Sequence, residues 1–265
     1  MALSGLVTFL NLALCLIVGV RLLRAGLHPD RRPELALAIY FLASPFFSTI
    51  CQGIVYGGMV DPRLALAEGT SHVVLGFGIL GMAVGGAAIC AFIAISFWAG
   101  SRWAWTIAVA GSALALCGFA FEALHEGFAV TLVPGPGHWT AWAGRTAPMV
   151  WLTVESLRYW RMLHRREALG LAEPVLMNRF LLWGIFSAAT FINLAADLIA
   201  HTLYTGFAGT TTEIVMEVMK PILIGTMIIT MILSMISAAA LFLTFFPPSR
   251  YRTWLEGRSL AHHPS

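Results

Sequence analysis

Charged side chains are scarce in this chain of 265 residues. They make up 11% of it, whereas hydrophobic residues make up 58%, and the mean hydropathy is +0.81. A soluble domain contains about 25% charged residues, so this chain has too few of them to cover itself with a water-compatible surface. Lipid must cover most of it, and the composition therefore predicts an integral membrane protein in contact with the lipid bilayer.

Several signatures of soluble chemistry are also absent from the sequence. It has no glycine-rich phosphate loop, no Gly-x-Ser-x-Gly nucleophile elbow and no basic, aromatic-interleaved strip for nucleic acid. No two cysteines form a Cys-x-x-Cys pair, and each lies in an apolar run: Cys15, Cys51, Cys90 and Cys117. We interpret them as small hydrophobic side chains. These absences predict no nucleic-acid partner, favour a non-enzymatic protein and confine any chemistry to the membrane.

Apolar segments long enough to cross the hydrocarbon layer recur seven times. Such a span needs about 20 apolar residues. We place the spans near 4–25, 35–58, 72–99, 103–127, 140–163, 179–204 and 214–246. Proline, glycine and charged residues mark the breaks between them. The pattern predicts an all-α fold: one domain, 1–265, built as a single bundle of seven transmembrane helices, with 247–265 as a short tail.

Basic residues are concentrated on one side of the predicted bundle. With the N-terminus outside, thirteen of the sixteen fall in inner loops or the tail, and the outer side keeps only Arg63, Arg145 and Lys220. The positive-inside rule then predicts an N-terminus outside and a C-terminus in the cytoplasm. We expect a multi-pass protein of a bacterial-type inner (plasma) membrane.

The third span is rich in glycine, with Gly76, Gly78, Gly81, Gly85 and Gly86 at helical spacing. Small residues in a membrane helix let a neighbouring backbone approach closely. We expect this span to be a crowded helix inside one bundle. The alternative is an interface in a homo-oligomer or a larger membrane complex.

Ionisable side chains within the spans gather in the outer part of the bundle. Each is costly to bury in a membrane and is therefore a functional hypothesis by default. Glu122, His125 and Glu126 are spaced i, i+3 and i+4, so they share one face of an α-helix, and Asp197 and His201 are spaced i, i+4. The other members are His72, Arg145, Asn193, Glu213, Glu217 and Lys220.

We predict that these polar stripes converge on a pocket open to the outside, which binds a small ligand. The expected ligand-binding residues are Glu122, His125, Arg145, Asn193, Asp197, His201, Glu217 and Lys220. Because no output domain is evident, this pattern favours a receptor- or sensor-like protein that signals through partners. The simpler alternative is that several of these side chains are merely solvated at the headgroup layer.

A metal or haem centre is the main alternative for the same residues. Glu-x-x-His on one helix and Asp-x-x-x-His on another are ligand spacings used in helical bundles. Glu122, His125, Asp197 and His201 would then hold a metal ion, with His72 as a further candidate, in a redox or hydrolytic protein. Two of the histidines could instead bind haem b. A channel or transporter is a lesser alternative, although no filter-like loop is evident.

Lys220 is the only lysine in the chain, and it lies on the seventh span. Its position resembles that of the Schiff-base lysine in seven-helix retinal proteins. A long apolar stretch follows Lys220, however, which places it near the outer boundary of the span, and the third span offers no carboxylate counter-ion. We therefore do not expect retinal.

Two further features lie near the predicted inner boundary. Glu155 and Arg158 are spaced i, i+3 on the fifth span and are predicted to pair. Arg250, Arg252 and Trp254 follow the last span and suit the lipid headgroup layer. We predict an anchoring role for both features.

Overall fold

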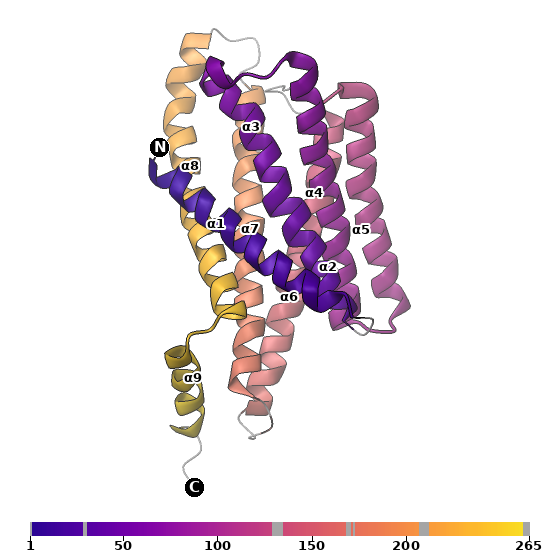
Figure 1. Ribbon diagram of the computed structural model, residues 1–265, viewed down its shortest axis with the longest axis vertical. Coiled ribbons are helices and arrows are strands. Elements are labelled where there is room, and N and C mark those ends of the chain that lie inside the picture. Colours follow the sequence, from indigo (N-terminus) through magenta and orange to yellow (C-terminus); the bar gives the residue numbers. More distant parts are fainter. Residues whose placement is uncertain are drawn as a thin grey trace. The chain divides into compact units, whose positions relative to one another are not determined.

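The computed structural model describes residues 2–28, 31–128, 135–167, 171, 173–206 and 212–261. Within these ranges all regular structure is helical and no strand occurs (Figure 1). The α-helices are α1 (Ala2–Gly26), α2 (Arg32–Phe41), α3 (Thr49–Val60), α4 (Glu68–Phe97), α5 (Arg102–Phe121), α6 (Pro136–Glu167), α7 (Pro174–Gly206), α8 (Thr212–Phe245) and α9 (Ser249–Ala261). Two π-helical segments, η1 (Leu42–Ser48) and η3 (Glu122–Glu126), and a 3₁₀ turn, η2 (Pro62–Leu64), join them. The predicted all-α class is confirmed.

Six stretches of the described chain are long and apolar enough to cross a membrane. They are Gly5–Gly26, Arg32–Gly58, Glu68–Phe97, Arg102–His125, Pro174–Ile199 and Ile224–Phe245. Each coincides with one predicted span, which supports a multi-pass membrane protein. The remaining predicted span, 140–163, lies in α6, which is 32 residues long. α6 carries Arg145, Glu155, Arg158 and Arg161 and is not among the six. The bundle of seven spans and its orientation stay predictions.

α6 turns polar side chains toward the protein interior and apolar ones outward. Glu155 and Ser156 are 5% and 0% exposed, whereas Val150 and Val154 on the same helix are 41% and 55% exposed. A helix on the surface of a soluble protein shows the reverse pattern, whereas polar residues of a membrane helix face the bundle interior. The distribution fits a helix that contacts lipid despite its charged residues.

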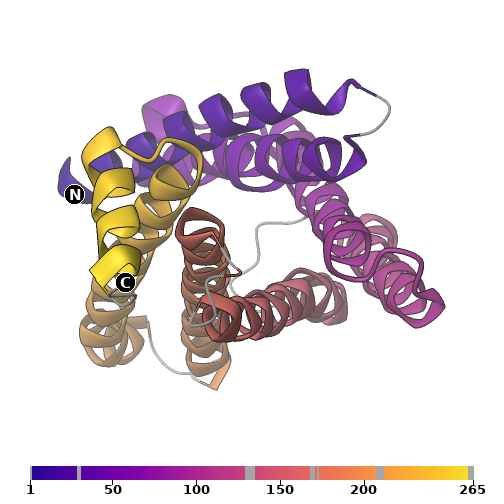
Figure 2. The same ribbon diagram turned by 90° about the horizontal axis from the view of Figure 1, so that it is seen from below.

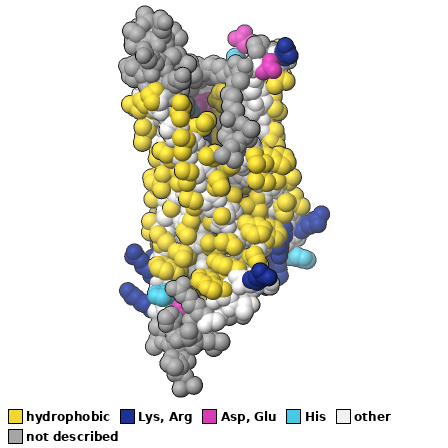
Figure 3. Space-filling view, turned by 90° about the vertical axis from the view of Figure 1, so that its left-hand side faces the viewer, with side chains coloured by type: hydrophobic (Ala, Val, Ile, Leu, Met, Phe, Trp, Pro, Cys, Tyr) yellow, Lys and Arg dark blue, Asp and Glu magenta, His cyan; other side chains and the backbone are white. Residues whose placement is uncertain are grey.

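Large hydrophobic side chains are exposed on most of the other helices as well. Phe9, Phe77, Val109 and Met235 are each more than half exposed. Figure 3 shows hydrophobic side chains over most of the face in view, with Lys and Arg side chains toward the ends of helices. Soluble monomers rarely expose contiguous apolar patches larger than a few hundred Å². An apolar surface of this extent is compatible with a lipid bilayer.

The chain divides into two compact units. Unit 1 comprises Met1–Leu14, Met149–Asn193 and Ile228–Ser265, and unit 2 comprises Cys15–Pro148 and Leu194–Met227. Four of the helices, α1, α6, α7 and α8, contribute residues to both units. Unit 2 also contains α2 to α5, and within it α4 packs against α2, η1, α3 and α5 (Figure 2).

The glycines of α4 provide the close contacts within unit 2. A Cβ atom on Gly81 would lie 2.7 Å from the carbonyl oxygen of Ala43 in η1, and one on Gly85 would collide with the Cβ atom of Ser44. No other residue allows helices to approach this closely. The predicted crowded helix is therefore confirmed, and the glycine stripe is used inside one chain rather than left free for a second copy.

Unit 1 is held together by contacts between the later helices. Thr153 of α6 donates a hydrogen bond from its Oγ1 to Ser187 Oγ of α7 at 2.9 Å. A Cβ on Gly184 of α7 would lie 2.9 Å from the side chain of Leu157 in α6. Trp183 packs edge-on against Phe245 of α8, with ring centroids 5.8 Å apart. Small residues and hydroxyls thus bring these helices together, as is typical of membrane bundles.

Candidate functional site

The end of α5 differs from an ordinary helix end. The chain widens into the π-helical segment η3, whose backbone is closed by a hydrogen bond from Gly127 N to Glu122 O of 2.8 Å. Gly127 ends the segment in the left-handed conformation, with φ of 62°, which glycine adopts without steric cost. Single π turns of this kind occur often at functional sites. Here the turn determines the direction of Glu122.

Glu122 is buried and faces the start of α6. Its side chain is 8% exposed, and its Oε1 lies 3.9 Å from Nδ1 of His138. The approach depends on Gly137, because a Cβ at that position would lie 2.7 Å from the Cγ of Glu122. A buried carboxylate needs hydrogen bonds or opposite charge to offset its lost hydration. His138 provides that charge when it is protonated.

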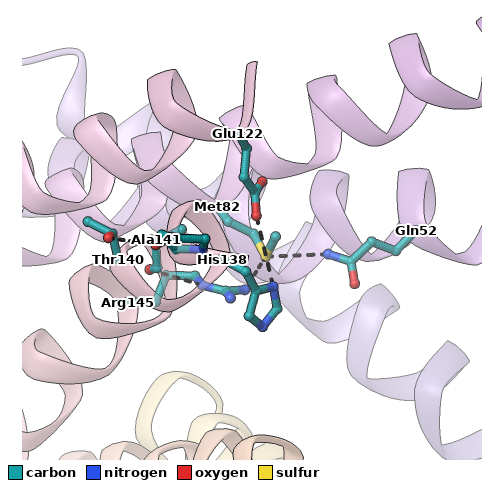
Figure 4. Close-up of polar contacts among 8 residues, drawn as sticks. Gln52, Met82, Glu122, His138, Thr140, Ala141 and Arg145 are labelled. Carbon is teal, nitrogen blue, oxygen red and sulfur yellow. Dashed lines mark hydrogen bonds and ion pairs between the residues drawn. The ribbon is translucent and has the colours of Figure 1, made fainter. Parts of the chain in front are cut away.

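Arg145 lies two turns further along α6, half-buried. Its Nε donates to the carbonyl oxygen of Ala141 at 3.4 Å, and its Nη1 contacts the sulfur of Met82 in α4. Gln52 of α3 reaches the same sulfur, with its Nε2 3.3 Å from Met82 Sδ, and also donates to Ser48 Oγ at 3.0 Å. Figure 4 shows these side chains pointing toward one another around Met82. Since a thioether sulfur is a weak acceptor, Met82 fills the centre of this group without neutralising Arg145.

Two carboxylates and one phenol act electrostatically on Arg145. The charge of Asp197 on α7 has the larger effect, followed by that of Glu122, and Tyr56 of α3 also contributes. A hydrogen bond from Trp142 Nε1 to Leu194 O of 3.0 Å joins α6 to α7. Arg145 and Asp197 each follow one of these partners by three residues, so each lies about one helical turn from this bond. We define the Arg145 cluster as Gln52, Tyr56, Met82, Glu122, His138, Arg145 and Asp197.

The cluster has an unbalanced charge. One guanidinium faces two carboxylates, so with His138 and Tyr56 neutral these groups carry one net negative charge. All of its members belong to unit 2. Glu122 is buried whereas Asp197 is exposed, so the excess negative charge lies where a proton or a bound cationic group can relieve it.

Three of the predicted site residues, Glu122, Arg145 and Asp197, are therefore brought together. His125 is not: it is exposed and stacks on Phe121, with ring centroids 4.4 Å apart. The prediction that Glu122 and His125 share a helix face is wrong here, because the wider π turn changes the angle between them. Asp197 is itself exposed, although its charge acts on Arg145.

The other predicted residues are not among the cluster's members or fall outside the description. His72 is half-buried on α4 with no contact to the cluster among the described ones, and Asn193 belongs to unit 1. Several side chains fall outside the described residues: Glu126, His201, Glu213, Glu217 and Lys220. Their predicted roles stay predictions.

No metal-binding group is found among the side chains that the structure describes. No three His, Cys, Asp or Glu residues of that part are close enough to hold a metal ion. The predicted set of Glu122, His125, Asp197 and His201 is not assembled there, since His125 is turned away and His201 lies outside the description. The metal hypothesis thus gains no support.

Four members of the cluster were not predicted from the sequence: Gln52, Tyr56, Met82 and His138. Gln52 and Tyr56 are spaced i, i+4 within an otherwise apolar span, and this spacing was a usable signal. His138 stands just before the fifth predicted span, at a predicted helix end, where a polar side chain gives no distinct signal. Met82 carried no signal, because a methionine in an apolar helix is ordinary.

The Arg145 cluster has to be interpreted from its own residues and their chemistry. Comparisons of the chain with protein-family models, with curated proteins and with solved structures found no match.

Proposed function

We propose that the protein is a multi-pass membrane receptor or sensor whose Arg145 cluster binds a small ligand. One observation carries this proposal: a half-buried guanidinium lies within electrostatic range of carboxylates on two other elements, η3 and α7, within a unit of membrane-type helices. Ionisable groups in such a place are costly and mark binding sites or ion pathways.

The charge of the cluster indicates the ligand's chemical class. With His138 neutral, the cluster is one positive charge short of balance. A ligand with a protonated amine would supply that charge and could approach Glu122 or Asp197. The side chains of Gln52 and Tyr56, both on α3, offer further hydrogen-bonding groups to the ligand. We therefore propose a small organic amine as the ligand.

Binding at such a site would act on several helices at once. The cluster draws on α3, α4, η3, α6 and α7, so a ligand that neutralises its charge also changes which helix contacts are favourable. Such coupling between helices suits a receptor that passes a change in its helix contacts to partner proteins. A nucleophile with an adjacent general base, which an acyl-transfer enzyme needs, is not among the cluster's members.

The orientation belongs to the same proposal. The arginine asymmetry favours an N-terminus outside, which would open the cluster's end of the bundle to the exterior. A reporter fused after Ser265 should then be active only in the cytoplasm, and one inserted in 128–138 only outside. The reverse pattern would rule out a site that receives ligands from outside.

Ligand binding can be tested with matched small molecules. Purified protein in lipid nanodiscs is heated with primary amines such as tyramine, and with tyrosol, in which a hydroxyl replaces the amine. We expect an amine to raise the melting temperature and its neutral counterpart to leave it unchanged. Glu122→Gln should abolish the increase, whereas Glu68→Gln, at an exposed position of the same unit, should preserve it. If no amine in the panel is selective over its neutral analogue, the proposed ligand class is wrong.

A further inference from the structure

Unit 1 carries a set of exposed arginines that are not members of the Arg145 cluster. Arg158, Arg161, Arg165 and Arg166 lie on the last turns of α6, and all four are exposed. Arg179 at the start of α7 and two arginines of α9 are exposed as well. These helices belong to one compact unit. The proposed receptor function does not use this surface.

α9 is attached to the rest of unit 1 by specific contacts. Asn178 of α7 donates a hydrogen bond from Nδ2 to the hydroxyl of Tyr251 at 2.8 Å. Tyr251 is half-buried, and Leu255, one turn later, is 9% exposed. On an adjoining face of the helix, Arg250 and Trp254 are spaced i, i+4; Trp254 is 55% exposed, and its ring stacks on that of Tyr251 with centroids 6.0 Å apart. α9 therefore presents a cationic and aromatic face while its apolar face is packed.

This face directly follows an apolar span. The stretch Ile224–Phe245 is long and apolar enough to cross a membrane, and only four residues separate its end from Arg250. An exposed tryptophan beside arginines at such a junction is typical of the interface between lipid and water. The headgroup layer is thus the surface that α9 can reach.

The choice of arginine over lysine indicates what these cations bind. Every exposed cation of this surface is arginine, and Lys220 is the only lysine of the chain. Membrane orientation requires only positive charge, which lysine supplies equally well. The planar guanidinium instead forms paired hydrogen bonds with phosphate oxygens. The arginines of this surface are therefore able to recognise phosphate as well as to orient the chain.

We propose that Arg179, Arg250 and Arg252 form a binding surface for the phosphate headgroup of anionic phospholipids. The hydrogen bond between Asn178 and Tyr251 holds α9 beside the start of α7, so the three guanidinium groups come from two joined elements. Trp254 lies at the lipid–water boundary next to them. The lipid would thereby hold α9 against the unit.

The test uses the full chain and two lipids. Native mass spectrometry and thermal unfolding are measured in detergent with added phosphatidylglycerol or phosphatidylcholine. We expect phosphatidylglycerol to be retained and to stabilise the protein, and phosphatidylcholine to do neither. Each arginine near an anionic surface accounts for about a fivefold change in affinity, so the triple change to Gln at 179, 250 and 252 should weaken binding about a hundredfold.

A matched control removes equal charge elsewhere. Arg21, Arg24 and Arg102 are exposed in unit 2, and their triple change to Gln should leave most of the selective binding intact. A triple change of Arg179, Arg250 and Arg252 to Lys keeps the charge and the fold but loses the paired hydrogen bonds. We expect it to bind phosphatidylglycerol more weakly than the unchanged protein.

Several outcomes would overturn the proposal. Equal retention of both lipids, equal losses in the two Gln triples, or full binding by the Lys triple would each reduce the arginines to nonspecific charge. Stabilisation by inorganic phosphate alone, without lipid, would make the site one for free phosphate. Tighter binding of a short RNA than of phosphatidylglycerol would assign the surface to a soluble polyanion.

Discussion

Among the side chains that the structure describes, each unit contains one buried carboxylate, and the surroundings of the two differ. Glu122 in unit 2 is 6% exposed, and it meets His138 and the charge of Arg145, both from another helix. Glu155 in unit 1 is 5% exposed, and its Oε2 lies 3.9 Å from Arg158, one turn away on the same helix. The predicted pairing of Glu155 with Arg158 is thereby confirmed.

Glu122 is therefore part of a network of charges from several helices, whereas Glu155 forms a local pair within one helix. Charges that come from several helices must be arranged by the tertiary fold, so changing one affects the others. A pair within one helix exists wherever that helix forms, and its exposed partner is screened by solvent: the side chain of Arg158 is 63% exposed. Burial of a carboxylate alone therefore does not mark a functional site. What distinguishes the two carboxylates is whether their partners come from other helices or from the same helix.

Removing Arg145 should have the largest effect. The change Arg145→Gln removes the cation on which the charges of Glu122 and Asp197 both act, and couplings within one charge network reach about 3 kcal/mol. We expect the free energy of unfolding, measured by denaturation in mixed micelles, to fall by about that amount. Adding Glu122→Gln should restore part of it. A loss below about 1 kcal/mol, in the range of ordinary surface changes, would contradict the network.

Removing His138 should have an intermediate effect that depends on Glu122. The two side chains approach to 3.9 Å, and contacts of this type couple by about 0.5–3 kcal/mol. We expect His138→Ala to destabilise the protein clearly, and to have much less effect in a Glu122→Gln background. The same unfolding measurement on the four proteins gives the coupling. An undiminished effect of His138→Ala in that background would mean that the pair is not formed.

Neutralising Glu155 should have a small effect. The Gln side chain keeps the size of Glu155 and removes a buried charge whose ion-pair partner is well exposed, so the two consequences nearly cancel. We expect Glu155→Gln to change the free energy of unfolding by less than about 1 kcal/mol, in either direction. A loss as large as that of Arg145→Gln would remove the distinction between the two units.

The smallest effect is expected at His125. Its ring is exposed and contacts Phe121 rather than the cluster. Substitutions at such positions change stability by about 0.5 kcal/mol or less. His125→Ala should therefore leave both the unfolding free energy and any amine-induced stabilisation unchanged. Loss of amine binding in this variant would show that His125 turns back toward the site.

Much of the fold was predictable because lipid imposes a simple pattern. Six of the predicted spans coincide with helices that are long and apolar enough to cross a membrane. Length and hydropathy suffice for such segments. The remaining predicted span, in α6, is not among them because it carries four charged residues, Arg145, Glu155, Arg158 and Arg161.

The site was predictable only in part. Glu122, Arg145 and Asp197 stood out as charges within apolar runs, which is a property of the sequence alone. His125 lies outside the cluster because a π turn ends at Gly127. The spacing of residues in the sequence gave no sign of this turn. Gln52 belongs to the cluster because α3 packs so that its side chain reaches Met82 of α4. Neighbours across helices follow from packing, and a single sequence does not encode them in any local pattern.

The central claim is that charges from different helices act as one network in unit 2 but not in unit 1. Two double-mutant cycles in the same micelles test it directly: Glu122→Gln with Arg145→Gln, and Glu155→Gln with Arg158→Gln. We predict a coupling of about 1–3 kcal/mol for the first cycle and of less than about 0.5 kcal/mol for the second. Additive effects in the first cycle, or equal couplings in both, would contradict the claim.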